Sequence, residues 1–262
     1  MKIEAILTPA ELPALAKRDL REMVCVVFDV LRATSTFVTA LHNGAKAIIP
    51  VGEIAEALAV RKGQPEVLLG GERDGVKIRA AQTGGIDFDL GNSPRECTQE
   101  KVRGKTIVST TTNGTRALRA CVGARTILAG SFLNLEVTAK FIQMLQPTEV
   151  LLICAGTREN CALEDVLAAG ALCELLEAGS SRGDDRTAQR PVPTTKSDSA
   201  EIAHRTWIQA KSDLAATVRN STNAQRLLAI PELRDNVAFC LQRDIFPLVA
   251  KMDVDGAIRR QL

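Results

Sequence analysis

VCVVFDVLRATSTFVTALHN, residues 24–43, joins an apolar run directly to a helical pattern. The apolar run predicts a strand that is buried on both faces of a sheet, and the segment after it predicts a helix. Polar side chains fill the turn between them: Asp29 ends the strand, Arg32 follows, and Thr34 and Ser35 begin the helix. Packing alone does not require this mixture, so we expect a functional site at the end of this strand.

The same alternation of strand and helix continues along the chain to residue 178. Further strands are predicted at residues 3–7, 46–51, 66–71, 105–109, 125–131 and 149–156, and further helices at residues 54–61, 114–122, 135–145 and 163–178. Apolar strands that alternate with helices are typical of a largely parallel sheet covered on both faces. The predicted fold is therefore α/β, a three-layer αβα arrangement with a largely parallel or mixed sheet and a C-terminal helical part.

Three parts are predicted along the chain. Residues 1–178 form an α/β catalytic core, residues 179–199 a polar loop or connector, and residues 200–262 a helical C-terminal part packed on the core. The middle part is assigned from its polar composition with glycine and two prolines, which is typical of loops. The sequence leaves open whether the parts make one continuous domain.

Composition argues against two classes of partner. The net charge is only +2 and aromatic residues make up 3% of the chain, whereas nucleic-acid binders usually carry a basic surplus and aromatic platforms. No apolar run approaches the ~20 residues of a membrane span, and the N-terminus lacks the layout of a signal peptide. We therefore expect a cytoplasmic protein that binds neither nucleic acid nor membranes, and whether it forms a homodimer is left open.

Metal chemistry is limited by the small number of nitrogen and sulfur ligands. The chain has only two histidines, His42 and His204, and its seven cysteines contain no CxxC pair. Such cysteines are expected to be reduced and mostly buried. A typical zinc enzyme needs several nitrogen or sulfur ligands. A metal would therefore have to use oxygen ligands, which favours Mg²⁺.

Polar side chains gather after three of the predicted strands, where open α/β sheets bind their ligands. They are Asp29, Arg32, Thr34 and Ser35 after one strand, Thr111, Thr112 and Asn113 after another, and Arg158, Glu164 and Asp165 after a third. In the segment TTTNGT, free backbone N–H groups at a helix N-terminus would bind an anion, and Gly114 would let the backbone approach a phosphate. Simple helix capping by Thr and Asn is the alternative.

A fourth polar group lies in a glycine-rich segment and comprises Glu72, Arg73, Asn92 and Ser93. Repeated glycines indicate tight turns and a backbone that closely approaches another group. The alternative is a surface loop, in which Ser93 caps a helical turn that starts at Pro94. Glu72 and Arg73 would then be a solvated pair.

Together these groups supply carboxylates, guanidinium groups and neutral donors, as a phosphoester site without histidine requires. The carboxylates of Asp29, Glu72, Glu164 and Asp165 would hold Mg²⁺. Glu164 and Asp165 are adjacent on a predicted helix and point in different directions. We therefore expect one of these two acids to be structural.

Four motifs also resemble those of a known family. DVLRATST, GGER followed by FDLGNSP, TTTNGT, and CAGT followed by LEDVLAAG occur in this order, and they resemble the 2-phosphosulfolactate phosphatase (ComB) family over nearly the full chain. The resemblance implies an α/β fold and a Mg²⁺-dependent hydrolase. It also implies the reaction of 2-phospho-3-sulfolactate to 3-sulfolactate and phosphate, on the route to coenzyme M.

The resemblance implies roles for the site residues. Asp29 would be a metal ligand or the nucleophile, and Glu72 with one of Glu164 or Asp165 would complete the Mg²⁺ sphere or act as general base. The phosphate would lie among Arg32, Thr111, Thr112 and Asn113. Arg73 and Arg158 would receive the carboxylate and sulfonate of a small anionic phosphorylated substrate.

The chain departs from the family pattern between GGER and FDLGNSP, where residues 74–87 form a longer link, and near its C-terminus. The longer link flanks the expected site, so these departures concern the substrate more than the type of reaction. Two alternatives stay open at this point: a phosphatase of another 2-phospho-carboxylic acid, and a non-catalytic binding protein for a small organic anion.

Overall fold

The computed structural model describes residues 1–180 and 194–261. The strands are β1 (Lys2–Ile6), β2 (Met23–Phe28), β3 (Ala47–Pro50), β4 (Leu68–Arg73), β5 (Val76–Lys77), β6 (Thr106–Thr110), β7 (Thr126–Gly130), β8 (Glu149–Cys154), β9 (Thr195–Lys196), β10 (Val249–Met252) and β11 (Ile258–Gln261). The helices are α1 (Leu12–Leu15), α2 (Ala33–His42), α3 (Ile54–Gly63), α4 (Ala80–Thr83), α5 (Gln99–Val102), α6 (Gly114–Ala120), α7 (Leu135–Leu145), α8 (Leu163–Ser180), α9 (Asp198–Ala210), α10 (Leu214–Arg219), α11 (Thr222–Leu228) and α12 (Arg234–Cys240). The predicted strands and helices of residues 1–178 are all present.

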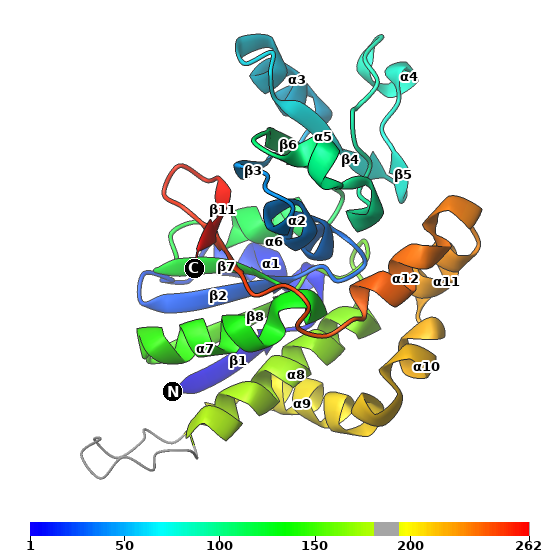
Figure 1. The fold of residues 1–262 in the computed structure, drawn as a ribbon. Coiled ribbons are helices and arrows are strands. Elements are labelled where there is room, and N and C mark those ends of the chain that lie inside the picture. Colours follow the sequence, from blue (N-terminus) through cyan, green and yellow to red (C-terminus); the bar gives the residue numbers. More distant parts are fainter. Residues whose placement is uncertain (181–193, 262) are drawn as a thin grey trace.

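The strands form one mixed sheet in the order β5-β4-β6-β3-β11-β10-β7-β2-β8-β1-β9. Helices cover both of its faces, so the prediction of a three-layer α/β fold is confirmed (Figure 1). Along β2, Val24, Val26 and Phe28 pack under α7, α8 and α9 on one face. Cys25 and Val27 pack under α1, α2 and α6 on the other. Burial of successive residues on opposite faces explains the continuous apolar run of this strand.

The sheet contains two parallel groups of strands that run in opposite directions. One group is β4, β6 and β3, and the other is β7, β2, β8, β1 and β9. The hairpin β10–β11 lies between them and is antiparallel to β7 and β3. Neighbouring strands twist by about 20–25°, so the five pairings from β6 to β2 add roughly 100° of rotation. Residues near the carboxyl ends of β2 and β8 in one group and of β4 and β6 in the other line one common pocket.

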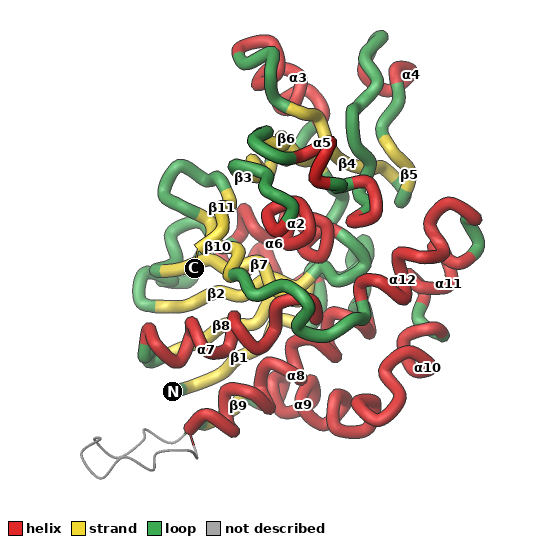
Figure 2. Tube along the Cα trace, in the orientation of Figure 1, coloured by secondary structure: helices red, strands yellow, loops and turns green. Residues whose placement is uncertain are grey.

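The C-terminal part differs from its prediction, because it is not helical throughout. Residues 249–252 and 258–261 are strands in the middle of the sheet. Their short sequences VAKM and IRRQ mix polar and apolar residues, and pairing with β7 and β3 makes them strands. Helices α10, α11 and α12 continue from α9 in a curved row (Figure 2).

The predicted connector lies partly outside the described residues, which omit 181–193. Its first two residues end α8, and residues 195–196 form β9, which pairs with β1. The division of the chain into three parts stays a prediction. Within the described ranges, no helix has the length and apolar character needed to cross a bilayer. All seven cysteines are free, and only Cys161 is exposed.

Candidate active site

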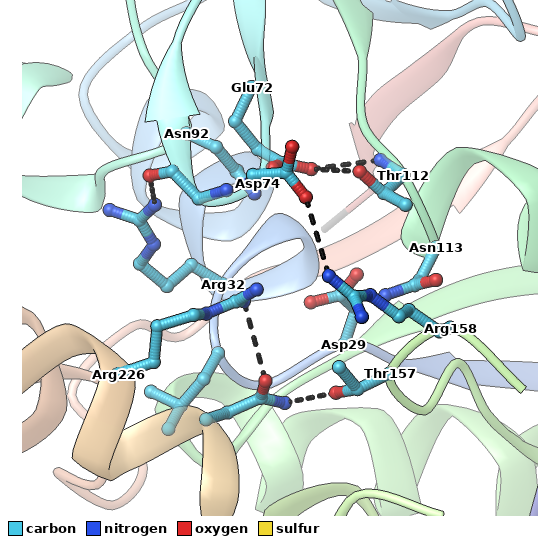
Figure 3. Close-up of a pocket in the computed structure, with 13 residues that line it drawn as sticks. Asp29, Arg32, Glu72, Asp74, Asn92, Thr112, Asn113, Thr157, Arg158 and Arg226 are labelled. Carbon is cyan, nitrogen blue, oxygen red and sulfur yellow. Dashed lines mark hydrogen bonds and ion pairs between the residues drawn. The ribbon is translucent and has the colours of Figure 1, made fainter. Parts of the chain in front are cut away.

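A polar pocket opens where the carboxyl ends of the two strand groups meet (Figure 3). It is lined by Asp29, Leu31, Arg32, Glu72, Asp74, Gly75, Asn92, Thr112, Asn113, Thr157, Arg158, Asn223 and Arg226. Most of these residues lie at or directly after the ends of β2, β4, β6 and β8 or on α11, and Asn92 lies in the loop that precedes Pro94. The structure therefore brings together residues from all four polar groups that the sequence identified.

Asp29 lies at the floor of the pocket, directly after β2. Its Oδ1 accepts a hydrogen bond from the backbone N–H of Ala33 at 2.9 Å, and its side chain is buried. Burial, together with the charges of Glu72 and Glu164, raises the pKa of Asp29 from 3.8 to about 6, although the Ala33 hydrogen bond and Arg32 oppose the shift. A carboxylate with this pKa is a candidate for proton transfer, metal binding or nucleophilic attack.

Gly114 has a different neighbour from the one the sequence suggested. A Cβ atom at this position would lie 2.6 Å from Asp29 Oδ2 and 2.6 Å from the Cβ of Ala33. The missing side chain therefore lets the start of α6 approach the carboxylate of Asp29.

Glu72, at the end of β4, connects two loops around the pocket. Its Oε1 accepts hydrogen bonds from the backbone N–H and the hydroxyl of Thr112, at 2.8 and 2.9 Å. Its Oε2 accepts from the backbone N–H of Gly75 at 2.6 Å. The carbonyl of Gly75 in turn accepts from the guanidinium of Arg32 at 2.6 Å. Glu72 and Arg32 are thus fixed by the same turn.

Arg73 does not reach the pocket, contrary to the prediction that it binds substrate. Its guanidinium donates to the carbonyl of Glu72 at 2.7 Å and to the hydroxyl of Thr110 at 3.1 Å, with longer contacts to two further carbonyl groups. The reason is the strand itself, because successive side chains point to opposite faces. Glu72 faces the pocket, so Arg73 faces away from it.

The adjacent acids Glu164 and Asp165 have different surroundings. Asp165 accepts hydrogen bonds from the backbone N–H groups of Val30 and Gly156, at 2.8 and 3.0 Å, and joins the loops after β2 and β8. Burial, with the charges of Glu164 and Asp29, raises the pKa of Asp165 well above 3.8. Glu164 accepts from Asn223 at 2.7 Å through Oε1, while its buried Oε2 has no partner. Asp165 thus binds the backbone through both of its oxygens, whereas Glu164 keeps one oxygen without a partner.

The hydroxyls of Thr34 and Ser35 are buried in the first turn of α2, and neither lines the pocket. Thr34 donates to the carbonyl of Asp29 at 3.0 Å, and Ser35 to that of Val30 at 2.8 Å. The hydroxyl of Thr111 likewise accepts from the backbone N–H of Thr115 at 3.2 Å. Short hydroxyl side chains at a helix start tend to satisfy the backbone in this way. The structure thus places these three residues beside the pocket rather than in it.

Of the remaining predicted donors, Asn92, Thr112 and Asn113 line the pocket and Ser93 does not. Ser93 precedes the helical turn Pro94–Glu96, as the sequence indicated. Asn92 is buried, and its Oδ1 has no hydrogen-bond partner. Asn113 precedes α6 without capping it through its side chain. Both amides are therefore free to bind a ligand.

Two arginines of the pocket face different surroundings. Arg32 is 3% exposed and its guanidinium also contacts Asn236 Oδ1 at 3.4 Å. Burial lowers the pKa of Arg32, and the nearby charge of Arg226 acts in the same direction. Arg158 is largely exposed and lies 3.8 Å from Asp74 across the pocket mouth. An exposed pair of this kind contributes little to stability.

Sequence reasoning missed Asp74, Thr157, Asn223 and Arg226, which also line the pocket. Asn223 and Arg226 are three residues apart on α11 and therefore share one face of the helix. That spacing is visible in the sequence, but nothing in it indicates that this face meets the ends of β2 and β8.

A Mg²⁺ ion in this pocket would be bound by only a few protein ligands. Within the part of the chain that is described, no group of three or more His, Cys, Asp or Glu side chains could hold a metal ion. Mg²⁺ often uses one or two carboxylates and completes its octahedron with water and substrate phosphate. Asp29 and Glu164 match this requirement, because Glu164 Oε2 has no partner and Asp29 uses only Oδ1 to bind the backbone.

Sequence comparison places these residues in a known family. The family model for 2-phosphosulpholactate phosphatase matches residues 7–254. This chain belongs to the 2-phosphosulfolactate phosphatase family. The family resemblance expected from the sequence is thus confirmed, and with it the enzyme class that the family name denotes, the phosphoric monoester hydrolases.

Three relatives show how far the similarity extends, and each is named "Probable 2-phosphosulfolactate phosphatase". The protein of Caldanaerobacter subterraneus subsp. tengcongensis is 36% identical over 244 residues, which cover 92% of both chains. That of Thermotoga petrophila is 40% identical over 224 residues, or 86% of both chains. That of Clostridium acetobutylicum is 33% identical over 250 residues, which cover 95% of this chain and 96% of the relative.

Proposed function

We propose that this protein is a Mg²⁺-dependent phosphatase that hydrolyses the phosphate monoester of a small 2-phospho acid. The preferred substrate in this proposal is 2-phospho-3-sulfolactate, which would give 3-sulfolactate and phosphate in a reaction of the coenzyme M biosynthesis type. The names of the relatives support this choice of substrate.

One observation about the pocket carries the proposal. Two buried carboxylates, those of Asp29 and Glu72, line the pocket with the guanidinium groups of Arg32 and Arg226. The buried carboxylate of Glu164 lines the adjoining cleft, close enough for its charge to act on Asp29. Like charges raise the pKa of Asp29, and a cation in the pocket would relieve this repulsion. The carboxylates would be stabilised by a cation and the guanidinium groups by an anion. A metal ion bound together with a phosphorylated substrate would supply both.

Each group then has a distinct task. Asp29 and Glu164 would hold Mg²⁺, which when bound neutralises phosphate oxygens and stabilises charge in the transition state. Asn113 would donate to phosphate oxygens opposite Arg32, while Thr112 donates to Glu72 beside it. Above about pH 6 the carboxylate of Asp29 is ionised, as metal binding or attack on phosphorus requires. We expect Mg²⁺ binding to weaken as the pH decreases through this value, because protonation of Asp29 then competes with the metal.

Phosphate release from 2-phospho-3-sulfolactate, with Mg²⁺ and with a chelator, tests the proposal. We expect turnover with Mg²⁺ and its loss after chelation. Glu164→Gln should lower kcat/KM on the order of 100-fold, because it removes a charged oxygen from the site. Glu159→Gln is the matched control, since Glu159 is exposed, pairs with Arg116 and lies outside the pocket lining. It should retain the activity of the unmodified protein.

Two further measurements identify the reaction. In ¹⁸O-water, one labelled oxygen in the released phosphate indicates hydrolysis, whereas its absence indicates transfer or elimination. A phosphorylated Asp29 trapped for mass spectrometry would make this residue the nucleophile. If the folded protein releases no phosphate from a panel of 2-phospho acids with Mg²⁺, the proposed function is wrong.

A further inference from the structure

Arg226 is a cation in the pocket that lacks a counter-charge. It is half-buried on α11, and its Nε is enclosed without a hydrogen-bond partner. Its hydrogen bond, to Asn223 Oδ1, is long at 3.4 Å. Among the described residues, no carboxylate forms an ion pair with it. Enclosing a guanidinium without an anion is costly, so this arrangement calls for a ligand.

Of the other pocket arginines, Arg32 already binds protein groups and Arg158 lies outside the enclosed part of the pocket. Arg32 donates to the carbonyl of Gly75 at 2.6 Å and contacts Asn236 Oδ1. Arg158 is exposed and faces Asp74 at the mouth of the pocket. Arg226 is therefore the guanidinium with the most unused capacity to bind an anion.

Asn223 holds Arg226 at a defined place in the site. The Asn223 amide donates to Thr157 Oγ1 at 2.5 Å and to Glu164 Oε1 at 2.7 Å, while its carbonyl oxygen accepts from Arg226. These contacts tie α11 to the loop after β8 and to the start of α8. The position of Arg226 is thus coupled to Glu164, which the proposed function assigns to Mg²⁺.

Arg226 also lies on the opposite side of the pocket from the proposed phosphate donor Asn113. Figure 3 shows its guanidinium reaching toward Asp29 from one side, with Asn113 and Thr112 on the other. Beyond Arg226 the pocket continues into a cleft of about 500 Å³, which Arg226 and Asn223 also line. A substrate whose phosphate lies beside Thr112 and Asn113 would extend its other acidic group toward Arg226.

We propose that Arg226, positioned by Asn223, determines specificity by binding the second acidic group of the substrate, a carboxylate or a sulfonate. The inference rests on the proposed function, and it assigns Arg226 the task that the sequence had given to Arg73. A guanidinium binds the oxygens of such a group through two parallel hydrogen bonds.

The test compares three phosphate esters that differ in their acidic groups. Glycerol 2-phosphate has none besides its phosphate, 2-phospholactate adds a carboxylate, and 2-phospho-3-sulfolactate adds both a carboxylate and a sulfonate. For Arg226→Gln we expect kcat/KM on the acid-bearing esters to fall on the order of 100-fold, mainly through KM. The fall on glycerol 2-phosphate should be much smaller. A loss on both acidic esters would assign the carboxylate to Arg226, and a loss on the sulfonated ester alone would assign the sulfonate.

Two variants control for charge and folding. Arg219→Gln removes the same charge from an exposed position on α10 outside the pocket lining, and it should change none of the three activities. Arg226→Lys retains the charge but lacks the two parallel N–H donors of a guanidinium. It should therefore recover part of the selectivity that Arg226→Gln loses. Circular dichroism and thermal unfolding confirm that each variant is folded.

Competitive inhibition by the two reaction products gives a second readout. With Arg226→Gln, the inhibition constant of 3-sulfolactate should rise far more than that of inorganic phosphate. Equal losses on all three esters, or equal changes for both inhibitors, would overturn the inference while leaving the phosphatase proposal intact. If the unmodified protein hydrolyses none of the esters but binds 3-sulfolactate through Arg226, the proposed function fails and the anion site remains.

Discussion

Asp29→Asn should make the protein more stable at neutral and alkaline pH, although it removes a residue of the proposed catalytic site. The Asp29 carboxylate is buried near Glu72 and Glu164, and the pKa of Asp29 is raised from 3.8 to about 6. A raised pKa means that the folded state binds the proton more tightly than the unfolded state. The stability that protonated Asp29 contributes is therefore fully present below about pH 4 and is lost as the pH rises through 6.

The size of the effect follows from the difference between the two pKa values. A shift from 3.8 to about 6 is about two units, and each unit corresponds to about 1.4 kcal/mol, so ionising Asp29 costs up to about 3 kcal/mol at pH 8. Asparagine has no charge to bury, and its Oδ1 still accepts the hydrogen bond from Ala33. The variant should thus gain most of this free energy at pH 8.

Urea unfolding of both proteins between pH 4 and pH 8, with a chelator present, measures the difference. We expect the free energy of unfolding of Asp29→Asn to exceed that of the unmodified protein by up to about 3 kcal/mol at pH 8, with the gap narrowing as the pH falls below 6. Mg²⁺ should stabilise the unmodified protein more than the variant. A variant that is less stable at pH 8, or a gap independent of pH, would refute the idea that burial and like charges raise this pKa.

Three further substitutions test where the structure places individual residues. Thr34→Ala should lower the free energy of unfolding by about 1 kcal/mol with little change in KM, because its hydroxyl binds the backbone rather than the pocket; urea unfolding and steady-state kinetics check this. Gly114→Ala should lower kcat/KM on the order of 100-fold, since the new Cβ would displace the carboxylate of Asp29; a fully active variant would contradict this. Asp165→Ala should cost about 1–3 kcal/mol of stability, because it leaves the buried N–H groups of Val30 and Gly156 without their acceptor; urea unfolding at pH 5, where the raised pKa of Asp165 favours its neutral form, measures the loss without the charge effect.

Local patterns carried much of the fold and of the site. The apolar runs predicted strands such as β2 and β8. Polar residues at strand ends led to Asp29 and Asn113, and the glycine-rich segment led to Glu72. Such elements can be predicted because their signals are local: the periodicity of apolar residues and the residue at which an apolar run ends. The family motifs gave the same positions, because they lie at the same strand ends.

Other features depend on contacts between distant segments. The hairpin β10–β11 takes its strand conformation from β7 and β3, so its own sequence gives a weak signal. Asn223 reaches the site through Glu164 and Thr157, about 60 residues earlier in the chain. No local pattern encodes the meeting of α11 with the end of the sheet. Long-range packing of this kind is where single-sequence reasoning fails.

Polar side chains that bind other protein groups differ from those that keep an atom available to a ligand. Asp165 and Arg73 both looked functional in the sequence, yet each makes its hydrogen bonds to backbone groups or to a neighbouring hydroxyl. Glu164, Asn92 and Arg226 each keep a buried polar atom without a partner. Because buried polar atoms in folded proteins are nearly always paired, such atoms around one pocket indicate bonds that a bound ligand completes. The carboxylate oxygen among them favours a cation and the guanidinium nitrogen favours an anion, which is the pair that a metal ion and a phosphorylated acid would supply.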